Sequence, residues 1–327
     1  MHLDHLLSYL QTLPAQSDWP HVWAGWRIER IVGGMNNLVY RATADDTDLA
    51  IKFTRRDARD RAGREYMALQ LLADLAVDLA PRPLLIERER YAQPVIVQQW
   101  LAGEVHAAPP ADDAEWLALI TFYAALHTAT AGHTEHVPPA VVNIGRVAQG
   151  RTMIAEQIDM LPAAAQPADL LELQQRLMAI DIPEPPGLRT ALCRVDSNIL
   201  NFIRRPTSWA SVDWENSGWG EPAFEIVDLM THPAYLEVPA ARWDALIDQY
   251  TKLSADRHAP EKIATFLPLM LIWWVARNAR SLYELPRGLD QRLSGDSDAM
   301  LLNIRQNQQH YLQRAHQALD RLGATMI

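Results

Sequence analysis

The segment RVDSNILNFIRRPTSWASVDWE, residues 194–215, carries more information about the fold than any other part of the chain. Asn201 follows Asp196 in this segment, and Asp213 comes after an apolar–turn–apolar stretch that predicts a β-hairpin. Transfer of a phosphoryl group from a nucleotide requires one carboxylate beside the acceptor hydroxyl, and an amide oxygen with a second carboxylate for Mg²⁺. The three side chains therefore predict a phosphoryl-transfer site, although Asp and Asn also cap ordinary turns.

A candidate phosphate-binding turn lies near the N-terminus, in the sequence IVGGMNNLVY at residues 31–40. It stands between two strand-like runs, residues 26–32 and 38–43. Gly and Asn tolerate the positive φ that lets backbone N–H groups turn toward phosphate oxygens. An ordinary hairpin turn has the same composition, so the turn alone does not distinguish the two. The residues that we assign to nucleotide binding are Gly33, Gly34, Asn36 and Asn37.

A single lysine, Lys52, interrupts the apolar strand-like run at residues 48–53. A lysine in an apolar strand is costly unless it is paired. The helical pattern at residues 58–75 supplies Glu65 as a candidate partner. A strand lysine paired with a helix glutamate orients nucleotide phosphates in kinases. The alternative is a solvated edge lysine and an unrelated surface glutamate.

The order of these features resembles that of the aminoglycoside phosphotransferase and choline kinase family, the small-molecule branch of the protein-kinase-like fold. The resemblance spans residues 33–233. The segment VDWENSGWGEPAFEIVDL, residues 212–229, is similar to the family's Asp-Trp-Glu…Gly-Asp-Pro…Asp-Leu-Ala region. Residues 95–104, VIVQQWLAGE, resemble its interlobe linker, and AALH at residues 124–127 resembles the Leu-His ending of its long C-lobe helix.

The resemblance implies an α+β, bilobal protein-kinase-like fold. Residues 1–99 would form a nucleotide-binding lobe with an antiparallel sheet and one main helix. Residues 100–327 would form a mostly helical lobe that carries the catalytic residues and binds the acceptor. A chain of 327 residues is long enough to form two such lobes around a cleft.

The resemblance also implies catalytic roles for three residues. Lys52 would contact the α- and β-phosphates of the nucleotide and be held by Glu65. Asp196 would accept, or at least orient, the proton of the attacking hydroxyl. Catalysis would then depend mainly on positioning and on neutralising the charge of the transferred group.

The implied cofactors are ATP and Mg²⁺. Asn201 and Asp213 would bind the Mg²⁺ ion, as the matching residues do in the family. The backbone at Gln99 and Leu101 would bind the adenine edge, as the linker does in such kinases. The sequence favours ATP but does not exclude GTP.

The chain departs from the family at Arg194 and Val195, where the family has His-Gly before the catalytic aspartate. The family's histidine ties this loop to an aspartate of the downstream helix, and Glu225 holds that position here. We therefore expect an ion pair between Arg194 and Glu225, with Arg194 facing solvent or a nucleotide phosphate as the alternative. Val195 would require a β-region backbone in place of glycine.

These features predict an O-phosphotransferase for a small hydroxylated acceptor, such as an aminoglycoside, choline or an amino alcohol. The alternative is a catalytically impaired, kinase-like nucleotide-binding protein, since Arg194 and Val195 depart from the family. A protein kinase is disfavoured because the stretch after Asp213 is too short for a peptide-binding activation loop.

The net charge of −10 is unevenly distributed. Residues 1–100 contain 13 acids and 12 bases, a net charge of −1, and residues 101–327 contain 27 acids and 18 bases, a net charge of −9. This balance disfavours nucleic-acid binding and suits a cationic acceptor, although acidic surfaces also serve solubility. The arginine-rich run at residues 55–64 is interrupted by Asp57 and Asp60, so it predicts a solvated loop and helix start rather than a phosphate site.

The single cysteine, Cys193, cannot form an internal disulfide, which fits a reducing compartment. The first residues lack the pattern of a signal peptide, so we expect a cytoplasmic protein. The apolar run at residues 266–276 contains Pro268 and is too short to span a bilayer, which predicts a buried helix and no membrane partner. The sequence gives no indication of the oligomeric state.

Overall fold

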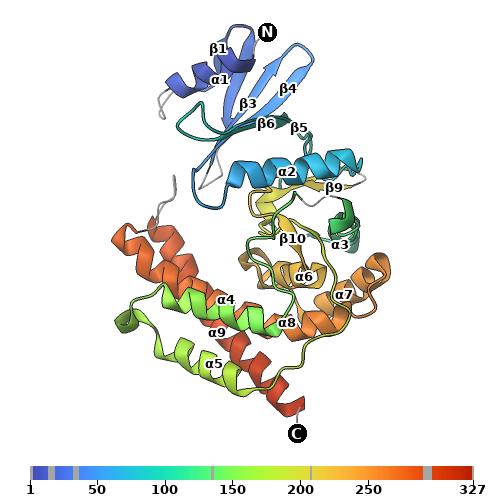
Figure 1. Cartoon of the computed structure of the whole chain (residues 1–327), viewed down its shortest axis with the longest axis vertical. Coiled ribbons are helices and arrows are strands. Elements are labelled where there is room, and N and C mark those ends of the chain that lie inside the picture. Colours follow the sequence, from blue (N-terminus) through green and yellow to red (C-terminus); the bar gives the residue numbers. More distant parts are fainter. Residues whose placement is uncertain are drawn as a thin grey trace.

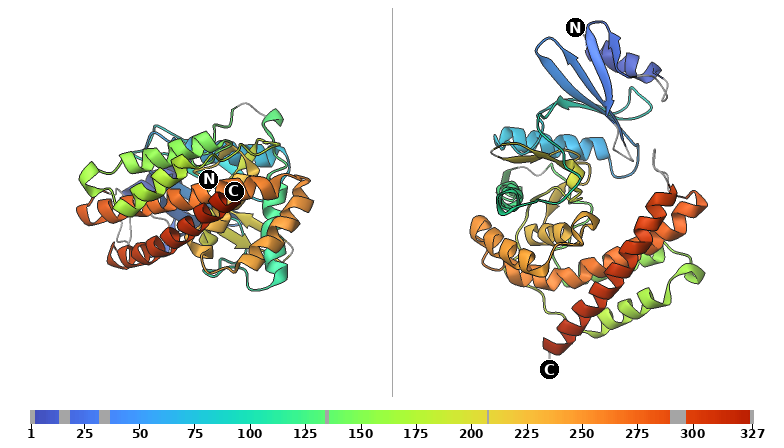
Figure 2. Two further views of the ribbon diagram at one scale, coloured as in Figure 1. Left: turned by 90° about the horizontal axis from the view of Figure 1, so that it is seen from below. Right: turned by 180° about the vertical axis from the view of Figure 1, so that it is seen from behind.

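The computed structural model describes residues 3–13, 19–31, 37–133, 136–206, 208–289 and 297–325. The chain has an α+β kinase-like fold, with an N-terminal antiparallel sheet and a helical C-terminal region (Figure 1). The sheet lies at one end of the molecule, and the long C-terminal helices lie at the other (Figures 1 and 2). The predicted fold class is therefore confirmed.

Six antiparallel strands form the N-terminal sheet, in the order β1-β2-β3-β4-β6-β5. Its strands are β1 (His21–Trp23), β2 (Trp26–Ile31), β3 (Asn37–Ala44), β4 (Thr47–Thr54), β5 (Pro83–Glu87) and β6 (Val95–Gln99). Helix α1 (Leu3–Thr12) packs its buried leucines against one face of this sheet. Helix α2 (Arg61–Asp74) follows β4 and contacts β5 and β6.

The alternation of side chains along β4 determines the direction of Lys52. Leu49, Ile51 and Phe53 belong to the same buried apolar cluster as the leucines of α1. Lys52 lies between Ile51 and Phe53 and therefore points to the opposite face. There its ammonium group contacts Glu65 of α2.

Helix α2 begins at Arg61 rather than at residue 58 as the periodicity predicted. Asp60 is its N-cap, and the Asp60 side chain accepts a hydrogen bond from the Gly63 N–H at 3.2 Å. A cap of this kind satisfies one of the free N–H groups of the first turn, which explains where the helix starts.

The C-terminal region contains seven of the helices in the described part of the chain and two short antiparallel strand pairs. The helices are α3 (Asp113–Leu126), α4 (Val147–Asp159), α5 (Ala168–Ala179), α6 (Pro222–Thr231), α7 (Ala240–Ser254), α8 (Ala259–Glu284) and α9 (Ser297–Thr325). The pairs are β7 (Ala191–Cys193) with β10 (Gly218–Gly220), and β8 (Phe202–Arg204) with β9 (Trp209–Ser211). The β8–β9 pair is the predicted hairpin.

Helix α8 forms the centre of this region and contacts α4, α6, α7 and α9. Among the described residues, one helical stretch, Ala259–Arg287, is long and apolar enough to cross a membrane by length and composition. However, 67% of its most apolar window is buried inside the protein, as in a core helix. The apolar run around Pro268 is thus part of α8, and its predicted burial is confirmed.

Tyr311 connects α9 to the rest of the helical region, and α8 and α9 run side by side (Figure 2). Its ring is fully buried and stacks on Trp274 of α8, with ring centroids 5.5 Å apart. Its hydroxyl group donates a hydrogen bond to the Thr231 carbonyl at the end of α6. One side chain therefore joins three helices.

We expect Tyr311→Ala to lower the free energy of unfolding by about 3–5 kcal/mol, because it removes a fully buried aromatic ring. Tyr311→Phe should cost about 1 kcal/mol, because it removes only the hydroxyl hydrogen bond. Urea denaturation measures both values. Leu302→Ala, at a position of α9 that is 59% exposed, is the matched control and should change the value by less than about 0.5 kcal/mol. Equal effects of Tyr311→Ala and the control would contradict this role of Tyr311.

Candidate active site

Lys52, Glu65 and Asp213 meet at the boundary between the sheet and the helical region. The Lys52 ammonium group donates to Glu65 Oε2 at 2.7 Å and also contacts Asp213 Oδ1. Burial disfavours the charged form of Lys52, but the carboxylates of Asp213, Glu65 and Glu215 outweigh this effect and raise its pKa. The lysine is therefore a buried cation at neutral pH.

A second link across this boundary involves Glu215, which follows Asp213 by two residues. Arg61 of α2 contacts Glu215 Oε1, and the Asn37 side-chain amide donates to Glu215 Oε2 at 2.9 Å. The same Asn37 nitrogen lies 3.5 Å from Asp213 Oδ1. The roles of Arg61 and Glu215 were not predicted. In the sequence, the sign of a role for Glu215 was its position two residues after Asp213.

Asn201 and Asp213 lie together at the base of the β8–β9 hairpin. The Val212 N–H donates to the Asn201 carbonyl at 2.9 Å, which continues the strand pairing by one step. Asp213 adopts φ 64°, a left-handed conformation that Asp tolerates better than most residues. Its side chain is 28% exposed, so the carboxylate is accessible. The backbone pairing brings the two residues to the same end of the hairpin. A carboxylate and a side-chain amide are oxygen donors of the kind that Mg²⁺ accepts.

Asp196 lies in the loop after β7, where its side chain is 36% exposed. Partial loss of solvent raises the pKa of this carboxyl to about 6, and the carboxylates of Asp213 and Glu215 add to the rise. The positive charge of Arg194 opposes it. These interactions show that Asp196 lies within electrostatic range of the acidic pair. Its pKa makes it ionised at neutral pH but able to take up a proton.

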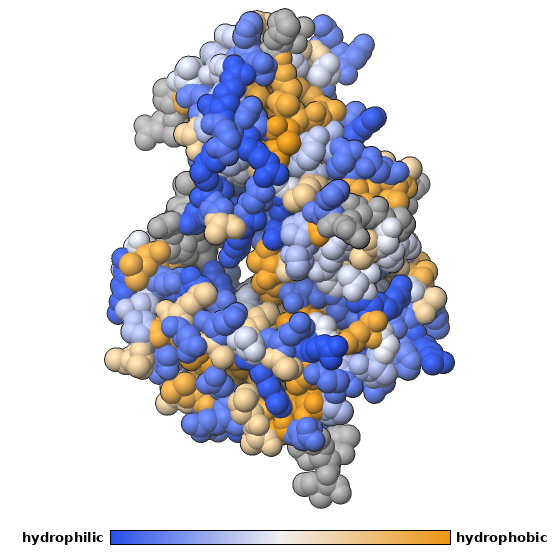
Figure 3. Space-filling model, in the orientation of Figure 1, coloured by the Kyte–Doolittle hydropathy of each residue, from blue (hydrophilic) through white to orange (hydrophobic). Residues whose placement is uncertain are grey.

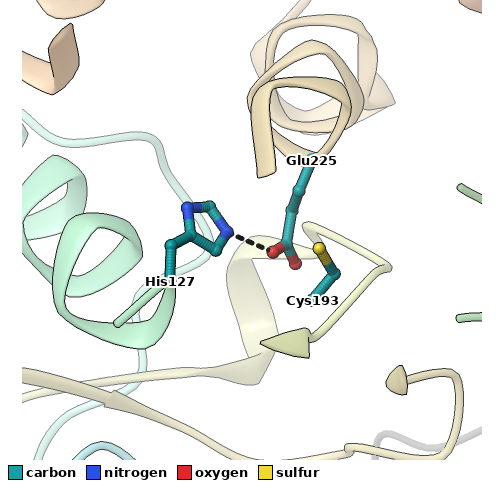
Figure 4. A group of neighbouring side chains, drawn as sticks. All are labelled: His127, Cys193 and Glu225. Carbon is teal, nitrogen blue, oxygen red and sulfur yellow. Dashed lines mark hydrogen bonds and ion pairs between the residues drawn. The ribbon is translucent and has the colours of Figure 1, made fainter. Parts of the chain in front are cut away.

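Glu225 of α6 holds the loop that carries Asp196. Its Oε1 accepts hydrogen bonds from the backbone N–H groups of Arg194 and Val195, at 2.7 and 2.8 Å. Its Oε2 lies 2.8 Å from His127 Nε2 (Figure 4). His127 Nδ1 in turn lies 2.8 Å from the Tyr250 hydroxyl. A fully buried carboxylate thus connects the loop to α3 and α7.

His127, Cys193 and Glu225 resemble a metal site in spacing alone (Figure 4). Their possible ligand atoms lie within 4.8 Å of one another. Both imidazole nitrogens and both carboxylate oxygens already have hydrogen-bond partners. Burial raises the pKa of the Cys193 thiol, which disfavours the thiolate that a metal would need. The group is therefore structural.

The predicted ion pair between the Arg194 and Glu225 side chains is wrong. The Arg194 guanidinium is buried, donates to the Asp196 carbonyl at 2.6 Å and lies over the Phe202 ring at 4.9 Å. Glu225 contacts the backbone of Arg194 instead. The expected β-region backbone of Val195 is also wrong, because its φ is 58°. The two hydrogen bonds to Glu225 hold this strained left-handed conformation in place.

His232 lies directly after α6 and was missed because no sequence motif marks it. Its Nε2 is 3.7 Å from Asp196 Oδ1. The Ala234 N–H donates to His232 Nδ1 at 3.2 Å, so the proton of the neutral ring is on Nε2, the nitrogen nearer Asp196. Burial, with the charge of Arg194, lowers the pKa of His232 to about 3. The ring is therefore neutral beside the carboxylate.

A cavity of about 880 Å³ extends from Asp196 between the loop before α2 and helices α4, α8 and α9. Figure 3 shows the hollow on this face, with strongly hydrophilic residues along its border. Five arginines contribute to the lining: Arg55, Arg59, Arg61, Arg277 and Arg280. The arginine-rich run at residues 55–64 forms an exposed loop and the start of α2, as predicted. Three of its side chains also line the cavity, which the sequence did not indicate.

The predicted adenine-binding linker follows the last strand of the sheet. The Gln99 N–H donates to the Arg82 carbonyl at 2.9 Å, so this donor is used inside the sheet. Of the two residues that we predicted to bind the adenine edge, Gln99 and Leu101, the backbone N–H of Leu101 is therefore the candidate donor. The remaining predicted nucleotide-binding residues, Gly33, Gly34 and Asn36, lie outside the described residues.

We expect double-mutant cycles to show stronger energetic coupling of Glu225 with His127 than with the Arg194 side chain. Combining His127→Ala with Glu225→Ala should show a coupling of about 1–3 kcal/mol in unfolding free energy, because the two side chains are bonded directly. Combining Arg194→Met with Glu225→Ala should show a smaller coupling, because the Arg194 N–H survives the substitution. A larger coupling for Arg194 than for His127 would contradict the arrangement.

Comparison with known proteins gives a consistent result. The profile of the phosphotransferase enzyme family (APH) matches residues 27–263. A choline/ethanolamine kinase family protein from Mesorhizobium loti is similar in structure over 98% of both chains, with a TM-score of 0.61 and 20% identity. Choline kinase LicA from Streptococcus pneumoniae matches over 97% of both chains, with a TM-score of 0.59 and 18% identity.

A spectinomycin phosphotransferase, solved with ADP and spectinomycin, matches over 97% of this chain and 98% of its own, with a TM-score of 0.62 and 12% identity. Among curated proteins, none matches this sequence. At these identities the structural matches establish the fold, while the family profile covers most of the chain, including Lys52, Asp196 and Asp213. The chain belongs to the phosphotransferase enzyme family.

Proposed function

We propose that the protein transfers the γ-phosphoryl group of ATP to a hydroxyl group of a small molecule and requires Mg²⁺. The observation that carries this proposal is the contact of buried Lys52 with Glu65 and Asp213, within electrostatic range of Asp196. These groups come from the sheet, from α2 and from the loops around the hairpin. The cavity beside Asp196 provides space for the molecule that receives the phosphoryl group.

Lys52 presents a fixed positive charge for the phosphates of the nucleotide. Glu65 orients this ammonium group, because it is buried and has no competing solvent. Asn201 and Asp213 would hold Mg²⁺, which when bound supplies charge neutralisation on the phosphates. Solved relatives support the use of a nucleotide, since their structures contain ADP, GDP, or AMP-PNP with Ca²⁺.

Asp196 accepts the proton of the acceptor hydroxyl during transfer. The hydroxyl oxygen forms a bond to the γ-phosphorus, the bond from that phosphorus to the bridging oxygen breaks, and ADP keeps the electron pair. The neutral ring of His232 stays beside Asp196 without adding charge. Arg194 stabilises the ionised form of Asp196 before the proton arrives.

The alternative is a nucleotide-binding protein that has lost catalysis through its Arg194 and Val195 substitutions. The contacts of Glu225 argue for an intact enzyme, because they hold the loop through its backbone and do not depend on a histidine or a glycine there. Asp196 also keeps its accessible carboxylate. The departures from the family therefore change how the loop is held in place, but the loop still carries the Asp196 carboxylate.

We expect Asp196→Asn to lower the rate of phosphoryl transfer by about 10²–10⁴-fold, because it removes the proton acceptor. ADP release measures the rate, with a panel of hydroxylated small molecules and with water alone as acceptors. Binding of AMP-PNP and Mg²⁺, measured by thermal shift, should persist in this variant. Asp45→Asn, in the exposed β3–β4 turn, is the matched control and should change neither quantity. Unchanged ADP release in Asp196→Asn would refute the catalytic role.

The pH dependence provides a second test. Protonation of Asp196 removes the base, so kcat/KM should fall about tenfold per pH unit below an apparent pKa near 6. Arg194→Met should move this limb to higher pH, because the arginine's charge lowers the pKa of Asp196. Arg194→Lys keeps the charge and should leave the limb near its original position. If the acidic limb of the pH profile does not move when the charge at residue 194 is removed, the limb belongs to a group other than Asp196.

A further inference from the structure

The cavity beside Asp196 has an unusual distribution of charge. Its lining includes five arginines and four carboxylates, with Glu156, Asp196, Asp228 and Glu284 as the acids. The arginines come from two opposite sides. Arg55, Arg59 and Arg61 come from the loop before α2 and from its first turn, and Arg277 and Arg280 come from α8.

Several of these charges are already used inside the protein. Arg61 pairs with Asp57 at 2.8 Å and contacts Glu215, and Arg280 pairs with Glu284 at 2.7 Å. Asp228 accepts a hydrogen bond from the Ser197 hydroxyl at 2.9 Å. These groups hold the walls of the cavity, whose other cations include Arg59.

Arg59 is the clearest of those cations. No described carboxylate forms an ion pair with its guanidinium group, although the lining of the cavity includes it. Arg59 is exposed, and partial desolvation together with repulsion from Arg61 and Arg280 lowers its pKa. The carboxylates of Asp57 and Glu215 offset part of this effect. Such repulsion is relieved when an anion binds between the guanidinium groups.

Helix α8 adds hydrogen-bond donors on the opposite wall. Trp274, Arg277 and Asn278 follow one another at the spacing of a single helix face, and all three contribute to the lining. Arg277 donates to the neutral Ser281 hydroxyl at 2.6 Å. Asn278 is only 6% exposed, and its side-chain nitrogen has no hydrogen-bond partner in the described structure. The Trp274 indole N–H is buried without a partner as well.

We propose that the acceptor is a hydroxylated molecule that also carries an anionic group, a carboxylate or a phosphate, held between Arg59 and the donor face of α8. The proposal rests on the proposed phosphotransferase function and names the class of its acceptor. The anionic group lies in the cavity while a hydroxyl group of the same molecule reaches Asp196. This proposal differs from the cationic acceptor that the net charge of residues 101–327 suggests.

The test compares four hexoses that differ only at carbon 6: glucose, glucuronate, glucose 6-phosphate and 6-amino-6-deoxyglucose. Binding of each is measured by calorimetry at constant ionic strength, with AMP-PNP and Mg²⁺ saturating the nucleotide site. Glucuronate, glucose 6-phosphate or both should bind at least about tenfold more tightly than glucose, and the amino sugar should bind most weakly. Comparison of the two anions distinguishes a carboxylate from a phosphate.

Variants locate the anion in the cavity. Arg59→Gln should weaken binding of the preferred anion about tenfold, and Arg59→Lys should retain part of it, because the charge is kept. Arg277→Gln, on the α8 wall of the cavity, should also weaken binding of the preferred anion. Arg27→Gln is the matched control, because Arg27 is exposed on β2 and pairs with Glu29, away from the cavity.

The outcomes separate this inference from the proposed function. Three results would overturn the anionic acceptor: preference for the amino sugar, equal binding of all four sugars, or no measurable binding of either anion. If AMP-PNP still binds in these cases, the proposed phosphotransferase function is not affected. Weaker AMP-PNP binding in Arg59→Gln, with unchanged anion binding, would assign the arginine to the nucleotide and also overturn the inference. Failure of the wild-type protein to bind AMP-PNP would instead overturn the proposed function.

Discussion

The ammonium group of Lys52 is the constraint on which the rest of the structure depends. A charge buried to this extent is tolerated only when other charges and hydrogen bonds compensate it. Glu65 supplies one carboxylate from α2, and Asp213 supplies another from the loop after the hairpin. The sheet, its helix and the C-terminal region must therefore meet at one point to satisfy a single side chain. The cleft between the lobes forms where they meet, and the same charge that holds them is the one that phosphates would meet.

A second buried carboxylate, Glu225, has a different task. It binds the backbone of the loop after β7, so this support does not depend on which side chains stand at residues 194 and 195. Val195 has a left-handed backbone, which β-branched residues disfavour. Two charge-assisted hydrogen bonds to Glu225 compensate the cost of this conformation. Arg194 in turn occupies the space beside Asp196 and lowers the pKa of that carboxyl. The loop thus keeps its geometry while its electrostatic surroundings differ from those of a His-Gly loop.

The fold and the central contacts were predictable because they follow from local patterns. The alternation along β4 already placed Lys52 on the face opposite Ile51 and Phe53, and the order of motifs indicated which glutamate it would meet. The hairpin bounds followed from the turn between two apolar runs. The contacts of Arg194, the backbone of Val195 and the position of His232 were not predictable, because each depends on a partner distant in sequence. A one-dimensional pattern can show that a charge needs a partner. A choice between His127 and Arg194 requires the position of His127, at the end of α3, relative to Glu225 of α6.

The arginines show that the net charge of a whole lobe does not describe the lining of the cavity. Charges on a solvated surface are screened over about 8–10 Å at physiological ionic strength, so most acids of residues 101–327 have little effect inside the hollow. A guanidinium group in the lining acts at short range and with less screening. Arg59 and Arg280 belong to different lobes, and a sum over either lobe alone hides the fact that they face the same space. Because the two sides of the cavity come from the two lobes, any closing or opening of the cleft also changes the distance between these cations. An anion bound between them would therefore link the two lobes, as the contact of Lys52 with Asp213 does.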